Sequence, residues 1–371
     1  MTSKIRTEPL LVQCPSLPDR DILNQYIDRI YQAKWITNNG QLVQELEREL
    51  TTYLDVPYLV LTANGTTALQ LALKLFNVEQ EVITTPFTFA ATGQAINWIG
   101  AKPVFADIDS KSLCLSPQSV AEKITDKTQA ILPVNVYGRT AHHEEFEELA
   151  KQHNLKLIYD GAQSFSTPSL HQKLALNSGD ATILSFHATK IFNTIEGGAL
   201  ILNNESDYLQ AKAMTNFGFS DGFPAEVGTN AKMNELEAAF GLANLHKVDL
   251  EIAKRKELTT AYLEKLGAMT ELNLVSSPNY SYMPVIFDSE MTLLSVAESL
   301  AESNIFGRRY FHPLQIGSDP KLLPTASSIS QRIYCLPLHN NMDIDDVTTI
   351  CTLIEQAVIR NQHTALNLKR S

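Results

Sequence analysis

The chain has 371 residues, and at about 150 residues per domain it should form about two domains. Its content of 44% hydrophobic and 19% charged residues is that of a globular protein and excludes a disordered, collagen-like or disulfide-stapled chain. With 30 basic against 41 acidic side chains the net charge is −11, and a surface of this sign repels phosphate backbones, so nucleic acid is not an expected partner.

The ends of the chain and its thiols indicate the compartment. Four cysteines lie far apart and form no C-x-x-C pair, which is typical of thiols in a reducing environment. The segment 1–16 carries charges and no long apolar stretch, so it is unlike a signal peptide. No apolar run approaches the roughly 18 residues needed to span a bilayer. We therefore expect a cytoplasmic protein with no membrane partner.

From the N-terminus to about residue 250, short β-rich runs alternate with helical patterns. This alternation is typical of βαβ units and predicts an α/β fold with a mostly parallel sheet. The seven predicted strands are Tyr58–Leu61, Glu81–Thr85, Pro103–Asp107, Ala130–Val136, Lys156–Tyr159, Thr182–Phe186 and Gly198–Leu202. The helices predicted between and after them are Thr66–Phe76, Thr88–Trp98, Pro117–Ile124, His142–His153 and Asp207–Asn216.

The pattern changes after Asn230. A long helical region is predicted over Asn234–Leu266, followed by a strand at Ser281–Phe287 and by helices at Leu293–Ser303 and Asp343–Arg360. We expect a large domain over residues 1–250, which includes the N-terminal segment, and a smaller C-terminal α+β domain over residues 251–371.

The loop that follows the first predicted strand has the features of an anion site. Gly65 permits a tight turn, and the N–H groups of Thr66 and Thr67 open a helix whose dipole favours a phosphate. The same Gly-Thr start is also an ordinary helix cap, so both interpretations stand equally for this segment alone.

Three further strand exits carry residues that complete a chemical pattern. Phe89 follows the second strand and could lie against a flat ring, although aromatic residues there are more often part of the core. Asp160 ends an apolar strand, where a buried carboxylate needs a cationic partner such as a protonated pyridine nitrogen. Lys190 follows the next strand, where desolvation would make its amine nucleophilic. Together these residues predict a pyridoxal phosphate (PLP) site.

These segments resemble the DegT/DnrJ/EryC1/StrS family of PLP-dependent sugar aminotransferases, from Trp35 to about Leu338. The run from Ser185 to Lys190 is similar to the family's cofactor-lysine motif, and 159–163 is similar to its E-D-A-A-Q element. The resemblance implies the fold-type I aminotransferase architecture, with a seven-stranded sheet in the large domain. It also implies PLP as cofactor and Lys190 and Asp160 as catalytic residues.

The resemblance further implies the remaining contacts of the cofactor. Its phosphate would be bound by Gly65, Thr66 and Ser185, its ring would stack on Phe89, and Gln163 would lie near its O3′. The segment 228–233 is similar to the family's G-x-N-x-R-M loop, whose asparagine reaches the neighbouring subunit's site. Asn230 therefore implies a homodimer with shared active sites. Lys232 stands where the family has arginine, and a lysine does not form the same bidentate contact.

The segments 35–40, 192–198 and 308–314 are most similar to family members that aminate C4 of a nucleotide-linked sugar. These enzymes use L-glutamate and dTDP-4-dehydro-6-deoxy-D-glucose, and their product, dTDP-4-amino-4,6-dideoxy-D-glucose, supplies surface polysaccharides such as O-antigen. For His187 substrate contact and simple packing are equally good interpretations, and Arg309 and His312 could equally lie at a domain interface. The substrate contacts implied are Thr37, Asn38, His187, Arg309 and His312.

Other functions fit the sequence less well or differ only in the substrate. A UDP-linked 4-keto sugar or a 3-keto sugar stays open as substrate. A PLP-dependent sugar dehydratase on the same fold is disfavoured because such relatives replace the lysine with histidine, and a non-catalytic regulatory protein would not need Lys190 and Asp160 together. No G-x-G-x-x-G follows the first strand, which disfavours a nicotinamide enzyme. The adjacent His142 and His143 do not share a helix face, so no metal site is expected.

Overall fold

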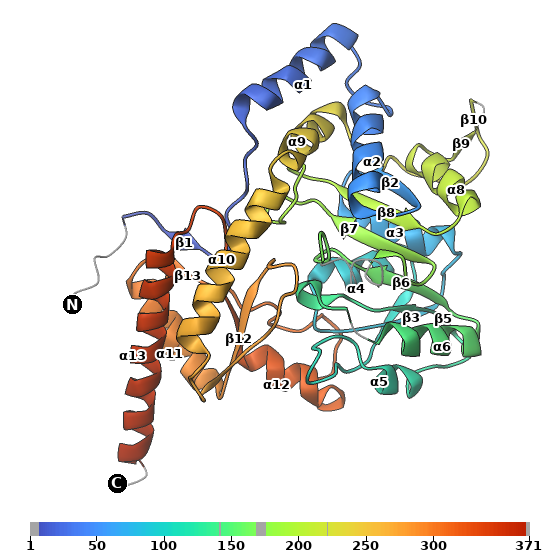
Figure 1. Cartoon of the computed structure of the whole chain (residues 1–371). Helices are drawn as coiled ribbons and strands as arrows, with labels where there is room; N and C mark the ends of the chain where they lie inside the picture. The colour runs from blue at the N-terminus through green and yellow to red at the C-terminus, as the bar shows by residue number, and fades with distance from the viewer. Residues whose placement is uncertain (1–6, 141, 168–175, 221, 369–371) are drawn as a thin grey trace. The chain divides into compact units, whose positions relative to one another are not determined.

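The computed structural model describes residues 7–140, 142–167, 176–220 and 222–368 (Figure 1). The chain forms two compact units. The large unit comprises Pro15–Val248 together with Gln315–Ala326, and the small unit comprises the N-terminal segment up to Cys14, Asp249–Leu314 and the segment from Ser327 onward. These units differ from the domains expected over 1–250 and 251–371 in two places: the N-terminal segment belongs to the small unit, and 315–326 belongs to the large one.

A seven-stranded sheet forms the centre of the large unit, as the sequence predicts. All neighbouring strands pair in parallel except β8, which runs antiparallel to both β2 and β7. The residues of β8 are buried throughout, which is expected of a strand that is covered on both faces. In spatial order the strands are β2 (Tyr58–Thr62), β8 (Gly198–Leu202), β7 (Ala181–Ser185), β6 (Lys156–Asp160), β5 (Thr128–Leu132), β3 (Glu81–Thr84) and β4 (Lys102–Phe105).

Helices of the large unit cover the sheet. The helix α3 packs on β7 and β8, whereas α6 packs on β5 and β6 (Figure 1). None of the helices in the described part of the chain is both long and apolar enough to cross a bilayer. The helices of this unit are α1 (Arg20–Ala33), α2 (Gln41–Leu54), α3 (Gly65–Leu75), α4 (Ala90–Trp98), α5 (Pro117–Ala121), η1 (Val136–Gly138), α6 (His143–His153), α8 (Glu205–Thr215), α9 (Glu235–Leu245) and η2 (Pro320–Leu322), and a short hairpin joins β9 (Phe219–Ser220) to β10 (Phe223–Pro224).

The start of α2 is capped from a distant part of the sequence. The N-cap residue, Gly40, has no side chain that could accept a hydrogen bond. The N–H groups of Leu42 and Val43 donate instead to the Glu235 carboxylate, each at 2.9 Å. A Cβ atom at Gly40 would lie 2.5 Å from the carboxyl carbon of Glu235, so glycine leaves room for this contact. Glu235 is the first residue of α9, and the contact therefore fixes α2 against α9.

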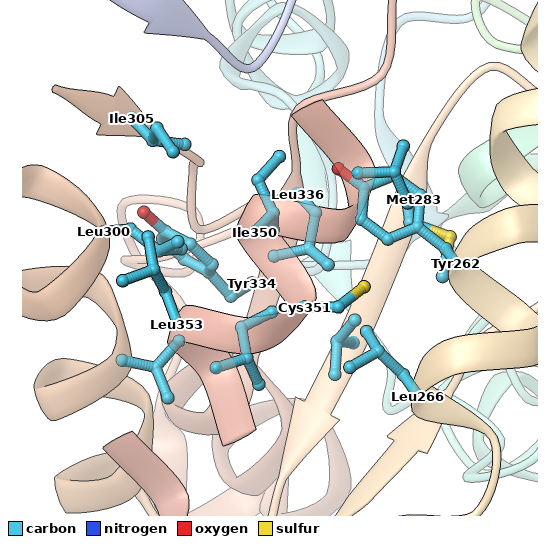
Figure 2. Close-up of a cluster of buried hydrophobic side chains, with 14 of the residues drawn as sticks. Tyr262, Leu266, Met283, Leu300, Ile305, Tyr334, Leu336, Ile350, Cys351 and Leu353 are labelled. Atoms are coloured by element: carbon cyan, nitrogen blue, oxygen red, sulfur yellow. The ribbon is translucent and has the colours of Figure 1, made fainter. Parts of the chain in front are cut away.

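The small unit is an α+β arrangement with its own core. Its antiparallel sheet has the order β11 (Leu272–Leu274), β12 (Met283–Phe287) and β14 (Ile333–Leu336). A short parallel pair joins β1 (Leu10–Leu11) to β13 (Ile305–Phe306). Side chains from this sheet, from α10 and from α13 pack into one apolar cluster, which includes Tyr262, Met283 and Ile350 (Figure 2). The helices are α10 (Val248–Leu266), α11 (Glu290–Glu302), α13 (Ile344–Leu368) and, shared with the large unit, α12 (Pro324–Arg332).

Candidate active site

One edge of the large sheet collects the predicted site residues. The strands β2, β3, β6 and β7 all point the same way, because β8 is antiparallel to its two neighbours. Their carboxyl ends therefore meet at one edge, where ligands bind in sheets of this kind. Gly65, Phe89, Asp160 and Lys190 lie at these strand ends or within a few residues after them.

The N-terminus of α3 forms a close-fitting cradle. The Asn64 side chain caps the helix by accepting from the N–H of Thr67 at 2.8 Å and from its hydroxyl at 2.9 Å. Gly65 lies against the end of β7, since a Cβ atom here would come within 2.9 Å of the Cβ of Ser185. The first N–H groups of α3 therefore lie beside the side chain of Ser185, which carries a hydroxyl. Helix N–H groups and a hydroxyl are donors suited to a phosphate.

Asp160 ends β6 with its carboxylate held by two donors. It is 4% exposed. Its Oδ2 accepts from the Thr92 hydroxyl at 2.7 Å, and its Oδ1 accepts from the N–H of Ala162 at 3.1 Å. Since the Thr92 proton is given to Asp160, Thr92 Oγ1 accepts in turn from the Thr88 hydroxyl at 2.9 Å. Two threonines of the segment that opens α4 thus fix the orientation of the carboxylate.

The charge of Asp160 is set by opposing influences. Burial raises the pKa of Asp160, because the charged form loses its hydration. The donors Thr92 and Ala162 lower this pKa, and so does the nearby positive charge of Lys190. A buried carboxylate of this kind is stabilised by a cation placed beside it.

Lys190 lies on a loop whose two ends are joined at the sheet edge. The loop leaves β7 and enters β8, and it is closed by two hydrogen bonds: the N–H of Phe186 to the carbonyl of Gly197 at 2.8 Å, and the N–H of Thr194 to the carbonyl of Phe186 at 2.9 Å. The N–H of Lys190 donates to the carbonyl of His187 at 2.8 Å. These contacts hold the backbone of Lys190 while its half-buried side chain can act on a ligand.

Comparison with known proteins decides the family. A family model for DegT/DnrJ/EryC1/StrS aminotransferases matches residues 19–355. The chain belongs to this family. It is 37% identical over 367 residues to the dTDP-4-amino-4,6-dideoxy-D-glucose transaminase of Shigella dysenteriae, covering 94% of this chain and 99% of that protein. It is 34% identical to the Escherichia coli transaminase of the same name, covering 92% of this chain and 96% of that one.

Solved structures agree with this assignment. The crystal structure of DesI in the presence of its TDP-sugar product has a TM-score of 0.91 at 32% identity and covers 98% of this chain and 96% of that one. The expected fold-type I aminotransferase architecture is therefore confirmed. The protein is a PLP-dependent aminotransferase.

The residues at the sheet edge fit this cofactor. The cradle at the start of α3 has donors for its phosphate, and filling Gly65 with a side chain would block the approach to Ser185. The buried Asp160 is a partner for a protonated ring nitrogen, and Lys190 supplies an amine near that carboxylate. The phosphate cradle, the buried carboxylate and the amine at this edge therefore match the chemical groups of PLP.

The other expected cofactor contacts are spread around the same unit. Gln163 is buried, and its Oε1 accepts from the N–H of Tyr137 at 2.7 Å, which fixes the orientation of its amide. Phe89 is the N-cap residue of α4 and is 61% exposed, so it is not a core residue. Thr66 lies in the first turn of α3. Asn230 is exposed, and its backbone forms an antiparallel β-bridge with that of Asn216.

The expected substrate contacts in the large unit are exposed. Thr37 and Asn38 lie in the loop before α2. His187 precedes Lys190 by three residues. Its Nδ1 lies 2.9 Å from the hydroxyl of Thr189, and its Nε2 lies 3.7 Å from the Glu196 carboxylate. The exposed position of His187 disfavours simple packing as its role.

Arg309 and His312 belong to the small unit. The Nη2 of Arg309 contacts Glu290 at 2.7 Å and donates to the carbonyl of Gln331 at 2.8 Å, whereas its buried Nε has no hydrogen-bond partner among the described residues. His312 is exposed, and its Nδ1 lies 3.1 Å from the Ser330 hydroxyl. These contacts hold both side chains to other residues of the small unit.

Thr88 and Thr92, the residues that orient Asp160, were not predicted as site residues. A signal was present, because two threonines four residues apart at a helix start lie on the same helix face. It also missed Gln315, whose amide donates to the carbonyl of Thr88 at 2.8 Å. The partner of Gln315 is far away in sequence, and no local pattern indicates it.

Proposed function

We propose that this aminotransferase moves the amino group of L-glutamate to C4 of dTDP-4-dehydro-6-deoxy-D-glucose, giving dTDP-4-amino-4,6-dideoxy-D-glucose. The observation that carries the proposal is the pairing of Lys190 and Asp160 at adjacent strand ends, in a chain that matches a transaminase of this name along nearly its whole length. The TDP-sugar product of DesI, a structural relative, supports a nucleotide-linked sugar as substrate.

Lys190 and Asp160 divide the proton chemistry between them. When bound, PLP supplies an electron-withdrawing ring that stabilises negative charge at the α-carbon of an amino acid. Lys190 Nζ would act as the base that takes the proton from that carbon and as the acid that gives it back. Asp160 would keep a proton on the ring nitrogen, and Thr92 and Ala162 hold the carboxylate in place for this task.

The remaining cofactor residues bind and orient. Gly65, Thr66 and Ser185 would hold the phosphate at the start of α3. Gln163 would face the O3′ side with its amide fixed by Tyr137, and the exposed Phe89 ring would cover the cofactor. On the substrate side, Thr37, Asn38 and His187 are exposed for contact with the sugar nucleotide.

The assembly of the enzyme is part of the proposal. We propose that the chain works as a homodimer in which Asn230 completes the phosphate site of the second copy.

The place of the enzyme in the cell is a further part of the proposal. We place the enzyme in the cytoplasm, where the amino sugar would be made for surface polysaccharide such as O-antigen. The absence of a disulfide among the four cysteines, all of which lie in the described residues, supports a reducing compartment.

The test uses purified holoenzyme with L-glutamate and dTDP-4-dehydro-6-deoxy-D-glucose, and NMR of the product. We expect an amine at C4 with the wild-type enzyme. We expect no product from Lys190→Ala, with an unchanged circular dichroism spectrum. An amine at C3, or turnover only with a UDP-linked sugar, would replace the proposed substrate, and turnover by Lys190→Ala would remove Lys190 from the mechanism.

A further inference from the structure

The loop that carries Lys190 has an unfavourable backbone conformation close to the lysine. Ile195 has a φ of 72°, in the left-handed region. A β-branched side chain disfavours this region, and such a residue keeps it only when its surroundings fix the backbone. The side chain of Ile195 is exposed, so packing returns little of the cost. The shape of this loop is therefore one that other contacts must fix.

Asn193 ties the loop to the N-terminal segment. It follows Lys190 by three residues and is buried. Its Nδ2 donates to the carbonyl of Ser16 at 3.1 Å, and its Oδ1 accepts from the N–H of Ile195 at 3.4 Å. One buried amide thus joins the strained residue to a segment that lies 177 residues earlier in the chain.

The helix α9 holds the same loop from a second side. Its buried Asn244 donates from Nδ2 to the backbone carbonyl of Asn193 at 2.9 Å. Gly241 of the same helix lies against the loop as well, because a Cβ atom here would come within 2.6 Å of the Cγ2 of Thr194. The helix therefore contacts two consecutive residues of the loop, 193 and 194.

The two segments that hold the loop are also joined to each other. Lys247 Nζ donates to the Ser16 hydroxyl at 2.7 Å and to the carbonyl of Leu17 at 2.5 Å. The N–H of Lys247 donates to the carbonyl of Asn244 at 3.1 Å. All of these residues belong to the large unit. The N-terminal segment, the end of α9 and Asn193 thus form one connected polar network.

We propose that Asn193 and Asn244 are positioning residues, which fix where Lys190 Nζ meets the α-carbon of the amino donor. Both act on the backbone three residues after Lys190, and neither needs to touch the substrate. A reacting group displaced by about 1 Å can lose about a hundredfold in rate, so the hold on this loop matters for the proton transfer. The inference goes beyond the proposed function, and it rests on that function for the role of Lys190.

Two substitutions, the loop variants, release the loop, and a matched control does not. Asn193→Ala removes both hydrogen bonds of that side chain. Asn244→Leu keeps the size of the side chain, and it should cost little stability because the buried Oδ1 of Asn244 has no hydrogen-bond partner in the described structure. The control, Asn203→Ala, removes an amide that donates to the carbonyl of Gly179 at 2.8 Å, at the other end of β8.

Hydrogen exchange of the apoenzyme tests the hold on the loop without the cofactor. We expect the peptide 186–197 to exchange about tenfold faster in both loop variants than in the wild type, because a hydrogen bond that fixes its backbone is lost. The control should leave this peptide unchanged. Unchanged exchange of 186–197 in both loop variants would overturn the proposal.

The reaction with L-glutamate alone tests the effect on Lys190. The absorption of bound PLP after mixing holoenzyme with excess L-glutamate gives a first-order rate constant, which does not depend on the fraction of active molecules. We expect this constant at saturation to fall about tenfold in both loop variants, with a half-saturating L-glutamate concentration close to that of the wild type. Faster exchange with an unchanged rate constant would assign the two asparagines to stability alone and contradict the proposal.

These measurements separate the inference from the proposed function. No sugar takes part in either of them, so a different nucleotide sugar as substrate would change the proposed function and leave the expected results as they are. A wild type that does not react with L-glutamate would show that the proposed donor is wrong, whereas the exchange of 186–197 would still test the hold on the loop. A wild-type rate constant in Lys190→Ala would overturn both, because Lys190 would then have no part in the reaction.

Discussion

Two consecutive residues of β6 have opposite environments. Side chains alternate across a strand, so Tyr159 and Asp160 point to opposite faces of the sheet. Tyr159 stacks on His143 of α6 with ring centroids 4.5 Å apart, and belongs to an apolar cluster with Phe146. Asp160 points to the face where Thr92 of α4 donates to it. The single register of this strand thus sets both the core contact and the position of the carboxylate that we propose to be catalytic.

The Thr92 hydroxyl should matter for catalysis through Asp160. Thr92→Val keeps the shape of the side chain and removes the donor, which leaves Oδ2 of a buried carboxylate without this hydrogen bond. The pKa of Asp160 should then rise further, because Thr92 lowers it in the wild type. We expect kcat to fall about tenfold, on the scale of one hydrogen bond to a charged group, and the cofactor's absorption to titrate differently with pH.

Thr92→Ser is the matched control for this prediction. It keeps the hydroxyl and should retain most of kcat and the wild-type spectral titration. If Thr92→Val and Thr92→Ser behave identically, the hydroxyl does not act on Asp160.

His143 should make stability depend on pH. It is 7% exposed, and neither ring nitrogen has a hydrogen-bond partner in the described structure. Burial lowers the pKa of His143 to about 4, against 6.5 for the ordinary group. The unfolded chain therefore binds the proton first as pH falls below 6.5, and the free energy of unfolding decreases until about pH 4. Between about pH 7.5 and about pH 5 the loss should be about 2 kcal/mol.

Urea denaturation at these two pH values measures the effect. His143→Phe keeps a ring against Tyr159 and removes the titration, so its stability should depend less on pH by about the same 2 kcal/mol. An unchanged pH dependence in His143→Phe would show that His143 is not the group responsible.

At the level of whole elements, the strands were predictable and the ends of helices less so. All seven strands of the sheet were expected, because apolar β-rich runs between helical patterns are a strong local signal. The strand expected over 130–136 ends at Leu132, since Pro133 follows and has no N–H for the sheet. The helical region expected over 234–266 is two helices, α9 and α10, that meet near His246.

The helices α1 and α2 were not predicted, and for α2 the cause is physical, whereas α1 has a local cap in Asp19. The α2 start has no cap of its own, and its donors meet Glu235 almost two hundred residues later in the chain. The site shows the same limit. The sequence predicted that Asp160 and Lys190 follow two consecutive strands, whereas Thr92, whose hydroxyl donates to Asp160, lies 68 residues before it in the chain. Local patterns predict which residues leave a strand end, but the partner that orients them depends on tertiary packing.

Glu235→Gln tests the long-range cap of α2. Glutamine loses the charge and replaces one acceptor with a donor that faces the N–H groups of Leu42 and Val43. We expect a loss of about 1–2 kcal/mol in the free energy of unfolding, as for other helix caps. Glu298→Gln, an exposed change on α11, should leave stability unchanged in the same denaturation assay. Equal stabilities for both variants would argue against the cap.

At the scale of the whole molecule, the surface predicts self-association. Apolar side chains are exposed along the segment that precedes Asn230, including Phe217, Phe223 and Val227, of which Val227 is 82% exposed. Light scattering on the eluting protein should give about twice 41.2 kDa. Val227→Asp should shift the mass toward one chain, whereas Leu294→Asp, an equally apolar exposed position on α11, should not. A single-chain mass for the wild type would contradict the proposed homodimer with its shared active site.

The pairing of β1 with β13 has a consequence for how the protein is made. Leu10 lies beside Ile305, so the small unit takes its first strand from the beginning of the chain and the rest from the end. During synthesis the segment from Pro15 to Val248 leaves the ribosome as a nearly continuous unit and can begin to fold at once. The small unit must wait for almost the whole polypeptide, with its N-terminal strand held as an unpaired end until Ile305 emerges.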